Sequence, residues 1–273
     1  MQKYNNEFEK IDMVEKAYVL GFFYSDGNVS NNQKHCRIQL AGQDKEILEE
    51  IQLQFPFFKL YKEKRSTKIT LYAGTKSFHR DLLANGCIPA KSAWNKEFLR
   101  FHSLGNKELD GAFIRGLWDG DGTYTLSAEG PKIQKRIALY SNSKTFVTDI
   151  SSLLTNYDIN NTIIRTETKP NNFSSVSGII YKLSVRTESY LKFYNFIYSE
   201  NLFLKRKRDK FNKLLEYKIF VQKPNINCKY CNSTNTVANG YNIYKGIKKQ
   251  RFLCKNCKRH TAQSSSDITL VQV

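Results

Sequence analysis

The sequence lacks any apolar run close to the roughly 18 residues that a helix needs to cross a bilayer. It also lacks a lipidation signal and a basic amphipathic helix. The first residues, MQKYNNEFEKID, mix charges and contain no apolar signal region. These absences argue against a membrane or secreted protein. We therefore expect a soluble intracellular protein, in the cytoplasm or nucleoid of a bacterial or phage system or in an organelle matrix.

Acidic residues are scarce, because 25 Asp and Glu stand against 43 Lys and Arg and give a net charge of +18. An excess of this size implies an extended negative partner, and nucleic acid is the leading candidate. Histidine is scarce too, and the few that are present have no metal-ligand spacing, which argues against a histidine-dependent nuclease. They are His35, His79, His102 and His260.

Cysteines are few but unevenly placed. Cys36 and Cys87 are isolated, whereas the remaining four form two C-x-x-C pairs separated by 22 residues: Cys228, Cys231, Cys254 and Cys257. In an intracellular chain such pairs favour a metal over a disulfide, and four thiolates suit tetrahedral Zn²⁺. A segment of about 40 residues needs such a metal to fold.

The same segment contains NGYN (residues 239–242) between short strand-like runs, which predicts a turn in a β-ribbon. His260 is a competing ligand that the second thiol pair makes unnecessary. Residues 217–227, with Pro224, are typical of a linker. We expect a structural zinc module at 221–265, resembling the zinc ribbons of transposases and other DNA-binding proteins.

The rest of the chain repeats itself. VLGFFYSDG (residues 19–27) and IRGLWDGDG (residues 114–122) each place a glycine five residues before an Asp-Gly pair. Each is followed by strand, helix, strand, helix and a basic segment, in the same order. The equivalent pairs include Gly21 and Gly116, Arg37 and Arg136, Thr75 and Thr187, and Lys91 and Lys207. We interpret this order as a duplication.

The predicted strands alternate as half-buried strands do. Apolar residues such as Ile38 and Leu40 face one way, and polar or basic residues face the other. A single strand of this kind would be an ordinary solvated face, but basic residues recur on nearly every strand, and strand pairs fit the major groove of duplex DNA. The candidate DNA-binding residues are Arg37, Gln39, Lys68, Thr70, Arg136, Lys182 and Arg186.

The two repeated segments are helix patterns that end on acid. Asp26 and Asp121 lie in the last turn, where the helix dipole disfavours a carboxylate by about 0.3–1 kcal/mol. Gly27 and Gly122 suit the left-handed position after a helix. Gly21 and Gly116 cost about 1 kcal/mol inside a helix, which is reasonable where two helices approach closely. If they pack together, the two carboxylates emerge side by side and form a site for Mg²⁺. The plainer alternative is a turn after a core helix.

These two segments resemble the paired motifs of a single-chain LAGLIDADG homing endonuclease. Tyr24 departs from the earlier acid that the family often has, where the second copy has Asp119. The resemblance implies an α+β fold with two pseudo-symmetric αββαββα halves, at 1–105 and 106–220, forming a monomeric saddle on double-stranded DNA. It also implies that Asp26 and Asp121 bind Mg²⁺ or Mn²⁺ for phosphodiester hydrolysis.

The resemblance also implies a lysine near the end of each half, which acts on the phosphate and its developing charge. Lys91 and Lys207 match that position, with Lys205 as a close alternative to the second. Gln43 and Asn142 are weaker candidates for ordering water. The implied function is site-specific cleavage of double-stranded DNA by a protein encoded in a mobile intron. The alternatives are a non-cleaving DNA-binding regulator and a maturase that binds intron RNA.

Overall fold

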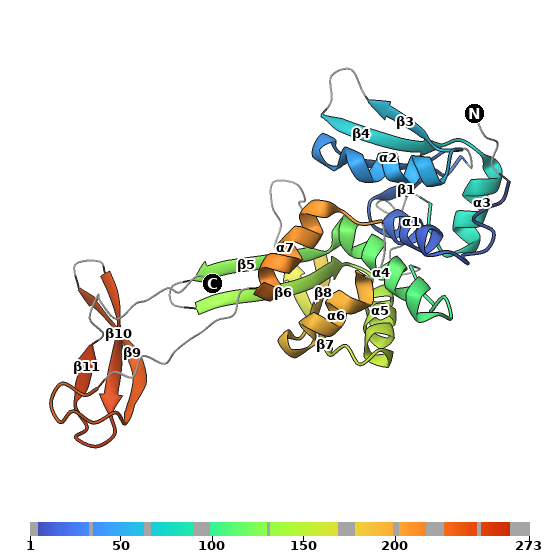
Figure 1. Cartoon of the computed structure of the whole chain (residues 1–273). Helices are drawn as coiled ribbons and strands as arrows, with labels where there is room; N and C mark the ends of the chain where they lie inside the picture. The colour runs from blue at the N-terminus through green and yellow to red at the C-terminus, as the bar shows by residue number, and fades with distance from the viewer. Residues whose placement is uncertain are drawn as a thin grey trace. The chain divides into compact units, whose positions relative to one another are not determined.

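The computed structural model describes residues 5–32, 35–62, 67–89, 99–129, 132–168, 178–198, 202–216, 227–244 and 247–262. The chain divides into two compact units, Met1–Tyr217 and Lys218–Val273. Figure 1 shows the first unit as a blue-to-orange assembly of helices and sheets and the second as a small red sheet.

The first half of the larger unit is a four-stranded antiparallel sheet with its helices. Its elements are α1 (Val14–Ser25), β1 (Gly27–Val29), β2 (Cys36–Ala41), η1 (Gly42–Asp44), α2 (Lys45–Gln54), β3 (Lys59–Lys62), β4 (Lys68–Ala73) and α3 (Lys76–Ala84). The strand order is β1-β2-β4-β3.

The second half repeats this arrangement. Its elements are α4 (Lys107–Asp121), β5 (Thr123–Glu129), β6 (Lys132–Ser141), α5 (Lys144–Asn156), β7 (Asn161–Thr168), β8 (Gly178–Val185), η3 (Thr187–Ser189), α6 (Tyr190–Ile197) and α7 (Lys205–Glu216). The strand order β5-β6-β8-β7 matches that of the first half. The predicted α+β fold with two αββαββα halves is therefore confirmed.

Side-chain caps explain where several helices begin. Thr75 Oγ1 accepts a hydrogen bond from the Phe78 N–H at the start of α3, and Ser143 Oγ does the same for Phe146 in α5. Asn106 Oδ1 accepts from the Glu108 N–H before α4. Each bond satisfies a donor that the first turn of a helix leaves open.

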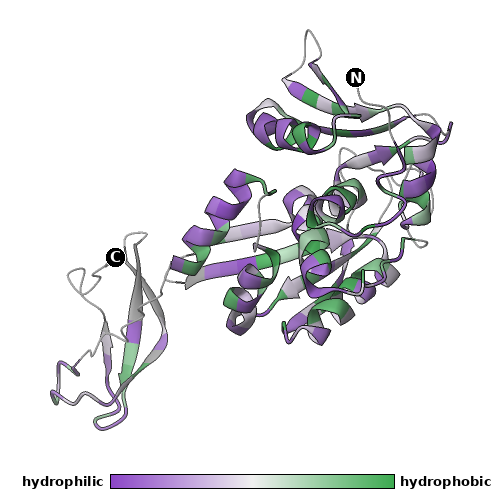
Figure 2. Ribbon diagram, turned by 45° about the vertical axis from the view of Figure 1, so that its right-hand side comes forward, coloured by the Kyte–Doolittle hydropathy of each residue, from purple (hydrophilic) through white to green (hydrophobic). Residues whose placement is uncertain are grey.

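The core of each half lies between the sheet and its helices. Ile38 pairs with Leu71 in the first sheet and Leu139 with Leu183 in the second, and all four are buried. In Figure 2 the central helices are largely hydrophobic, whereas α7 is mostly hydrophilic. Among the described residues, no helix has both the length and the apolar composition required to cross a membrane.

The second unit is an antiparallel sheet of β9 (Thr236–Tyr244), β10 (Ile247–Cys254) and β11 (His260–Ala262), in the order β11-β10-β9. The prediction of a turn at NGYN is wrong, because residues 239–242 lie inside β9. Gly240 has a φ of +71°, and the register shifts opposite Arg251, whose Nε donates to the Asn239 carbonyl. The signal that indicated a turn marks a β-bulge instead.

Candidate active site at the paired helix ends

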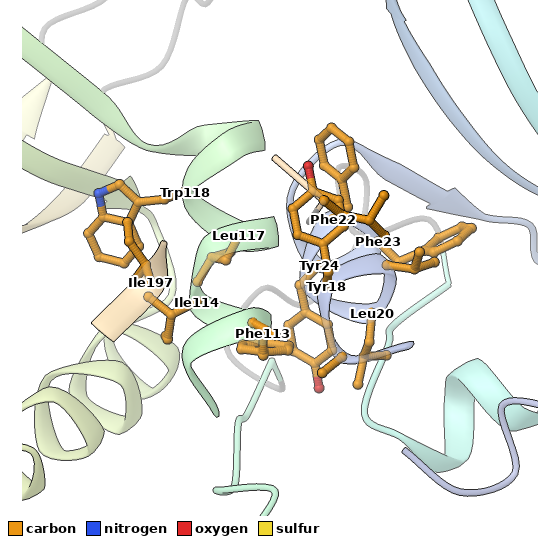
Figure 3. Close-up of a cluster of buried hydrophobic side chains, with 14 of the residues drawn as sticks. Tyr18, Leu20, Phe22, Phe23, Tyr24, Phe113, Ile114, Leu117, Trp118 and Ile197 are labelled. Atoms are coloured by element: carbon orange, nitrogen blue, oxygen red, sulfur yellow. The ribbon is translucent and has the colours of Figure 1, made fainter. Parts of the chain in front are cut away.

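Helices α1 and α4 touch backbone to backbone. A Cβ atom at Gly21 would lie 2.0 Å from the carbonyl oxygen of Phe113, and one at Gly116 would lie 2.0 Å from that of Tyr18. Neither distance is possible for a real side chain, so the glycines permit the contact. Figure 3 shows the two helices side by side, with Phe113 toward α1 and Trp118 directed away from it. The predicted glycine contact is confirmed.

Asp26 and Asp121 lie at matching ends of this helix pair. Helix α1 ends at Ser25, with Asp26 as its C-cap, and Asp121 is the last residue of α4. Both aspartates are exposed. A Cβ at Gly120 would lie 3.1 Å from Asp26 Oδ2 and 2.0 Å from Ser25 Oγ. The Asp26 carboxylate therefore lies beside the residue that precedes Asp121. Exposed carboxylate oxygens are donors that Mg²⁺ and Mn²⁺ favour, and both carboxylates lie at this end of the helix pair.

The glycine after each aspartate has a different purpose from the one expected. Among the described residues, the glycines with positive φ are Gly86, Gly105 and Gly240, and Gly122 has φ −70° and ψ 149°. The predicted left-handed conformation of Gly27 and Gly122 is therefore wrong. Side chains there would collide with the preceding turn, at 2.4 Å from Phe23 Cα and 2.3 Å from Trp118 Cδ1. These glycines let each helix lead directly into a strand.

Lys207 lies beneath the end of α4. Its side chain is only 8% exposed, and Nζ donates to the carbonyl oxygens of Trp118 at 2.9 Å, Gly120 at 2.9 Å and Gly122 at 2.5 Å. Burial lowers the pKa of Lys207 to about 8, although the nearby carboxylates, chiefly Asp119, oppose that change. The sequence predicted the lysine near the site but gave no sign of these three carbonyl partners.

Asp119 is buried beside Lys207. Its Oδ2 accepts hydrogen bonds from Tyr18 Oη at 3.0 Å and from the Leu204 N–H at 2.7 Å. Desolvation raises the pKa of Asp119 to about 7, and those two hydrogen bonds reduce the effect. Since Tyr18 belongs to α1 and Leu204 precedes α7, this carboxyl group joins segments from both halves.

Of the other residues predicted to act near the carboxylates, only some lie close to Asp121 among the described residues. Asn142 lines a cavity of 360 Å³ together with Ser25 and Asp121. Gln43 lines a separate groove of 520 Å³ with Lys205, which is exposed at the start of α7. Lys91 lies outside the described residues.

The open face of the first sheet carries polar, basic and aromatic side chains. Arg37 is exposed and pairs across the strands with Tyr72, whose hydroxyl lies 2.5 Å from His35 Nδ1. Lys68 is exposed at the strand end. Thr70 is buried, and its Oγ1 accepts from Gln39 Nε2 at 3.1 Å, which fixes the direction of the Gln39 amide. The sequence-based set missed Tyr61, which is exposed beside Tyr72.

The second sheet has a corresponding face with a different composition. Lys182 lies between Tyr140 and Ile164 in register, and both neighbours are exposed. Arg136 is exposed on β6, and Arg186 is exposed just beyond the end of β8. The candidates of this half therefore lie along one sheet, but their aromatic and aliphatic neighbours differ from those of the first.

The four paired cysteines of the second unit meet at one point. Their sulfur atoms all lie within 4.8 Å of one another, with Cys228 and Cys257 at 3.4 Å and Cys231 and Cys254 at 3.6 Å. Tetrahedral Zn–S bonds of about 2.3 Å place sulfurs about 3.8 Å apart. The cluster therefore fits Zn²⁺, and His260 is exposed on β11 outside it.

The two cysteine pairs adopt the same local turn. Asn232 and Lys258, each four residues after the first cysteine of its pair, have positive φ and donate their N–H to the carbonyl of Cys228 or Cys254. Burial would raise the pKa of Cys228, but hydrogen bonds from the N–H groups of Tyr230 and Cys231 and with the neighbouring cysteine thiols lower it to about 6. These repeated turns point backbone donors at sulfur and favour the thiolate that a metal needs.

Comparison with solved structures found similarity to homing endonucleases. Variants of the homing endonuclease I-DmoI are 17% identical, with 72% of this chain and 99% of that chain covered and a TM-score of 0.46. I-DmoI in complex with DNA and Mn is 19% identical, with 71% and 100% covered and a TM-score of 0.46. The meganuclease I-SmaMI bound to uncleavable DNA is 10% identical, with 73% and 88% covered and a TM-score of 0.47.

No curated protein sequence matches this chain. The model of the LAGLIDADG-like domain matches residues 13–83 and 108–198, which is more than half of the chain and includes both glycine-aspartate motifs. The chain therefore belongs to the LAGLIDADG-like domain family.

Proposed function

We propose that this protein is a site-specific endonuclease that hydrolyses one phosphodiester bond in each strand of duplex DNA. The observation that carries this proposal is the pair of exposed carboxylates at the ends of two helices in backbone contact. A regulator needs only the DNA-binding faces, whereas Asp26 and Asp121 add a metal-binding group at the junction of the halves. In keeping with the family resemblance, we propose that a mobile intron encodes the protein.

Asp26 and Asp121 would hold Mg²⁺ or Mn²⁺ between the two halves. When bound, such ions activate water and stabilise the leaving oxygen of an in-line displacement. The helix contact at Gly21 and Gly116 keeps the two carboxylates at a fixed separation. Lys91 is proposed to contact the phosphate in the first half, and Gln43 and Asn142 to orient water.

The two sheet faces supply DNA binding. Basic side chains on both faces, including Arg37 and Lys182, would contact phosphates, and polar groups such as the Gln39 amide can read base edges in the major groove. One chain contains both faces, so a monomer is sufficient. Because affinity then depends mainly on phosphate contacts, it should fall steeply with added salt.

The cysteine module would bind Zn²⁺ and extend the DNA contact. Between residues 227 and 262 the sequence has eight Lys and Arg and no Asp or Glu. On its surface Tyr230 is 49% exposed, with Lys229 Nζ 4.9 Å and the Arg259 guanidinium 5.1 Å from the ring centroid. Two cations arranged around an exposed tyrosine fit a sugar-phosphate backbone.

Cleavage of a randomised duplex library tests the proposal. With Mg²⁺ the wild-type protein should cut one sequence class and leave short 3′ overhangs. Asp26→Asn and Asp121→Asn should each abolish double-strand cleavage but retain binding, because an amide is a much weaker ligand for a divalent cation. Lys192→Ala, at an exposed lysine on α6, is the matched control.

The alternatives predict different outcomes of the same experiment. Tight binding to one duplex without cutting in Mg²⁺ or Mn²⁺ would favour the regulator. Specific binding to intron RNA with faster splicing would support the maturase, which can coexist with cleavage. Full cleavage by the Asp26→Asn, Asp121→Asn double variant would refute the proposed site.

A further inference from the structure

All three N–H donors of the Lys207 ammonium group form hydrogen bonds within the protein. A lysine has three N–H donors, and Nζ of Lys207 has three carbonyl partners, on Trp118, Gly120 and Gly122. The side chain is also buried. A phosphate could bind this group only if one of these three hydrogen bonds broke.

The position of Lys207 resolves the electrostatic conflict at the end of α4. The last carbonyls of a helix lack intrahelical donors and carry the negative end of its dipole. Asp121 adds a carboxylate at that same end. A buried cation that binds the carbonyls on both sides of Asp121 satisfies them and offsets the local negative charge.

The segment around Lys207 also ties the two halves together. Arg206 forms a bidentate ion pair with Asp44 of η1, with nitrogen-oxygen distances of 2.7 to 3.0 Å. The Leu204 N–H binds Asp119, which also accepts from Tyr18 of α1. Residues 204–207, which we call the clasp, therefore contact the first half through Arg206 and the end of α4 through Lys207.

We propose that Lys207 is a positioning residue, which holds the end of α4, and with it Asp121, against the end of α1. This inference rests on the proposed function for its catalytic consequence, but its structural part does not. It differs from the role implied by the family resemblance, in which Lys207 acts on the phosphate and its developing charge. The clasp therefore fixes the distance between the two carboxylates.

Hydrogen exchange of the free, full-length protein tests the structural part. Lys207→Met preserves much of the aliphatic stem but removes all three donors. Exchange in the α4 C-terminal peptide, at Trp118–Gly122, should become at least tenfold faster, while exchange in the β2–β4 pair stays unchanged. Lys210→Met, which alters an exposed lysine one turn along α7, is the matched control and should leave both unchanged.

Cleavage and binding by the same variants test the catalytic part. Lys207→Met should lower the single-turnover rate about 100-fold with less than a threefold change in Kd. It should slow both strands together, because both carboxylates lie at the same end of the α1–α4 pair. Normal exchange with slow cleavage of one strand would overturn the proposal and indicate direct phosphate contact. If the wild-type protein does not cleave DNA, the proposed function fails, while the exchange result still tests whether the clasp positions the end of α4.

A second variant covers the case in which Lys207→Met does not fold. Arg206→Gln breaks only the link to Asp44, on the edge of the clasp. It should speed exchange at the end of α4 by a smaller factor than Lys207→Met. It should also slow cleavage, as Lys207→Met does. Unchanged exchange in Arg206→Gln together with wild-type cleavage would show that the clasp does not position α4.

Discussion

Alanine at Gly116 is expected to impair catalysis strongly while the protein stays folded. Its Cβ would lie 2.0 Å from the Tyr18 carbonyl oxygen, and real contacts are not below 3.0 Å, so the helices must separate locally by about 1 Å. Overpacking costs about 1–3 kcal/mol, and the better helix propensity of alanine returns about 1 kcal/mol. The free energy of unfolding should therefore fall by no more than about 2 kcal/mol. A displacement of about 1 Å at a catalytic group can cost about 100-fold in rate.

Gly111→Ala is the matched control in the same helix. Its Cβ would lie 2.3 Å from the Phe196 carbonyl oxygen, which belongs to α6 of the same half. Urea unfolding of the two variants should show similar losses of stability. Single-turnover cleavage at saturating protein should be about 100-fold slower in Gly116→Ala but within a few-fold of wild type in Gly111→Ala. Equal rates in the two variants would show that the α1–α4 contact does not set the carboxylate geometry.

Further predictions concern the metal, the sheet faces and the buried acid. Freshly purified protein should contain about one zinc per chain. Chelation should unfold only the segment after about residue 223, as followed by hydrogen exchange. A protein without metal, or a disulfide between the cysteine pairs, would contradict this. Arg37→Ala and Lys182→Ala should each weaken DNA binding and reduce the salt slope by about 1, and an unchanged slope would exclude a phosphate contact. Because burial raises the pKa of Asp119 from its ordinary value of 3.8 to about 7, the folded state binds more protons than the unfolded state in that range. This group therefore lowers stability as pH rises from 3.8 to about 7. Asp119→Asn should flatten that part of the pH profile of urea unfolding, and an unchanged profile would show that Asp119 is not responsible.

The sequence predicted the architecture because the repeated features have strong local causes. The glycine five residues before each Asp-Gly pair predicted a close helix contact, and the alternation of Ile38 and Leu40 with polar residues predicted a sheet with one open face. Similarly, the two C-x-x-C pairs predicted one four-sulfur cluster. In each case a residue type of distinct size or chemistry recurs at a fixed spacing, and few local structures can accommodate that spacing.

The sequence did not predict features that depend on long-range contacts or on backbone conformation. Nothing in the segment FLKRKRDK distinguishes Lys207, which binds three carbonyls, from the exposed Lys205 two residues earlier. The ion pair between Arg206 and Asp44 joins residues far apart in the chain. Glycine at position 27 or 240 indicates that a side chain is unfavourable there, but not whether the cause is a collision, as at Gly27, or a positive φ, as at Gly240.

The two halves share the contact between their motif helices but not the composition of their open sheet faces. The glycine contacts are reciprocal, since Gly21 packs on the backbone of α4 and Gly116 on that of α1, so a larger residue in either copy would disturb both.

No such constraint acts on the open sheet faces. Register aligns Gln39 with Thr70 and Tyr61 in the first sheet, and Tyr140 with Lys182 and Ile164 in the equivalent row of the second. The glutamine amide can make paired hydrogen bonds with a base edge, whereas Tyr140 and Ile164 are an exposed aromatic and an exposed aliphatic side chain. We therefore expect a target whose two half-sites differ in sequence, cut by a pair of carboxylates that the two halves position jointly.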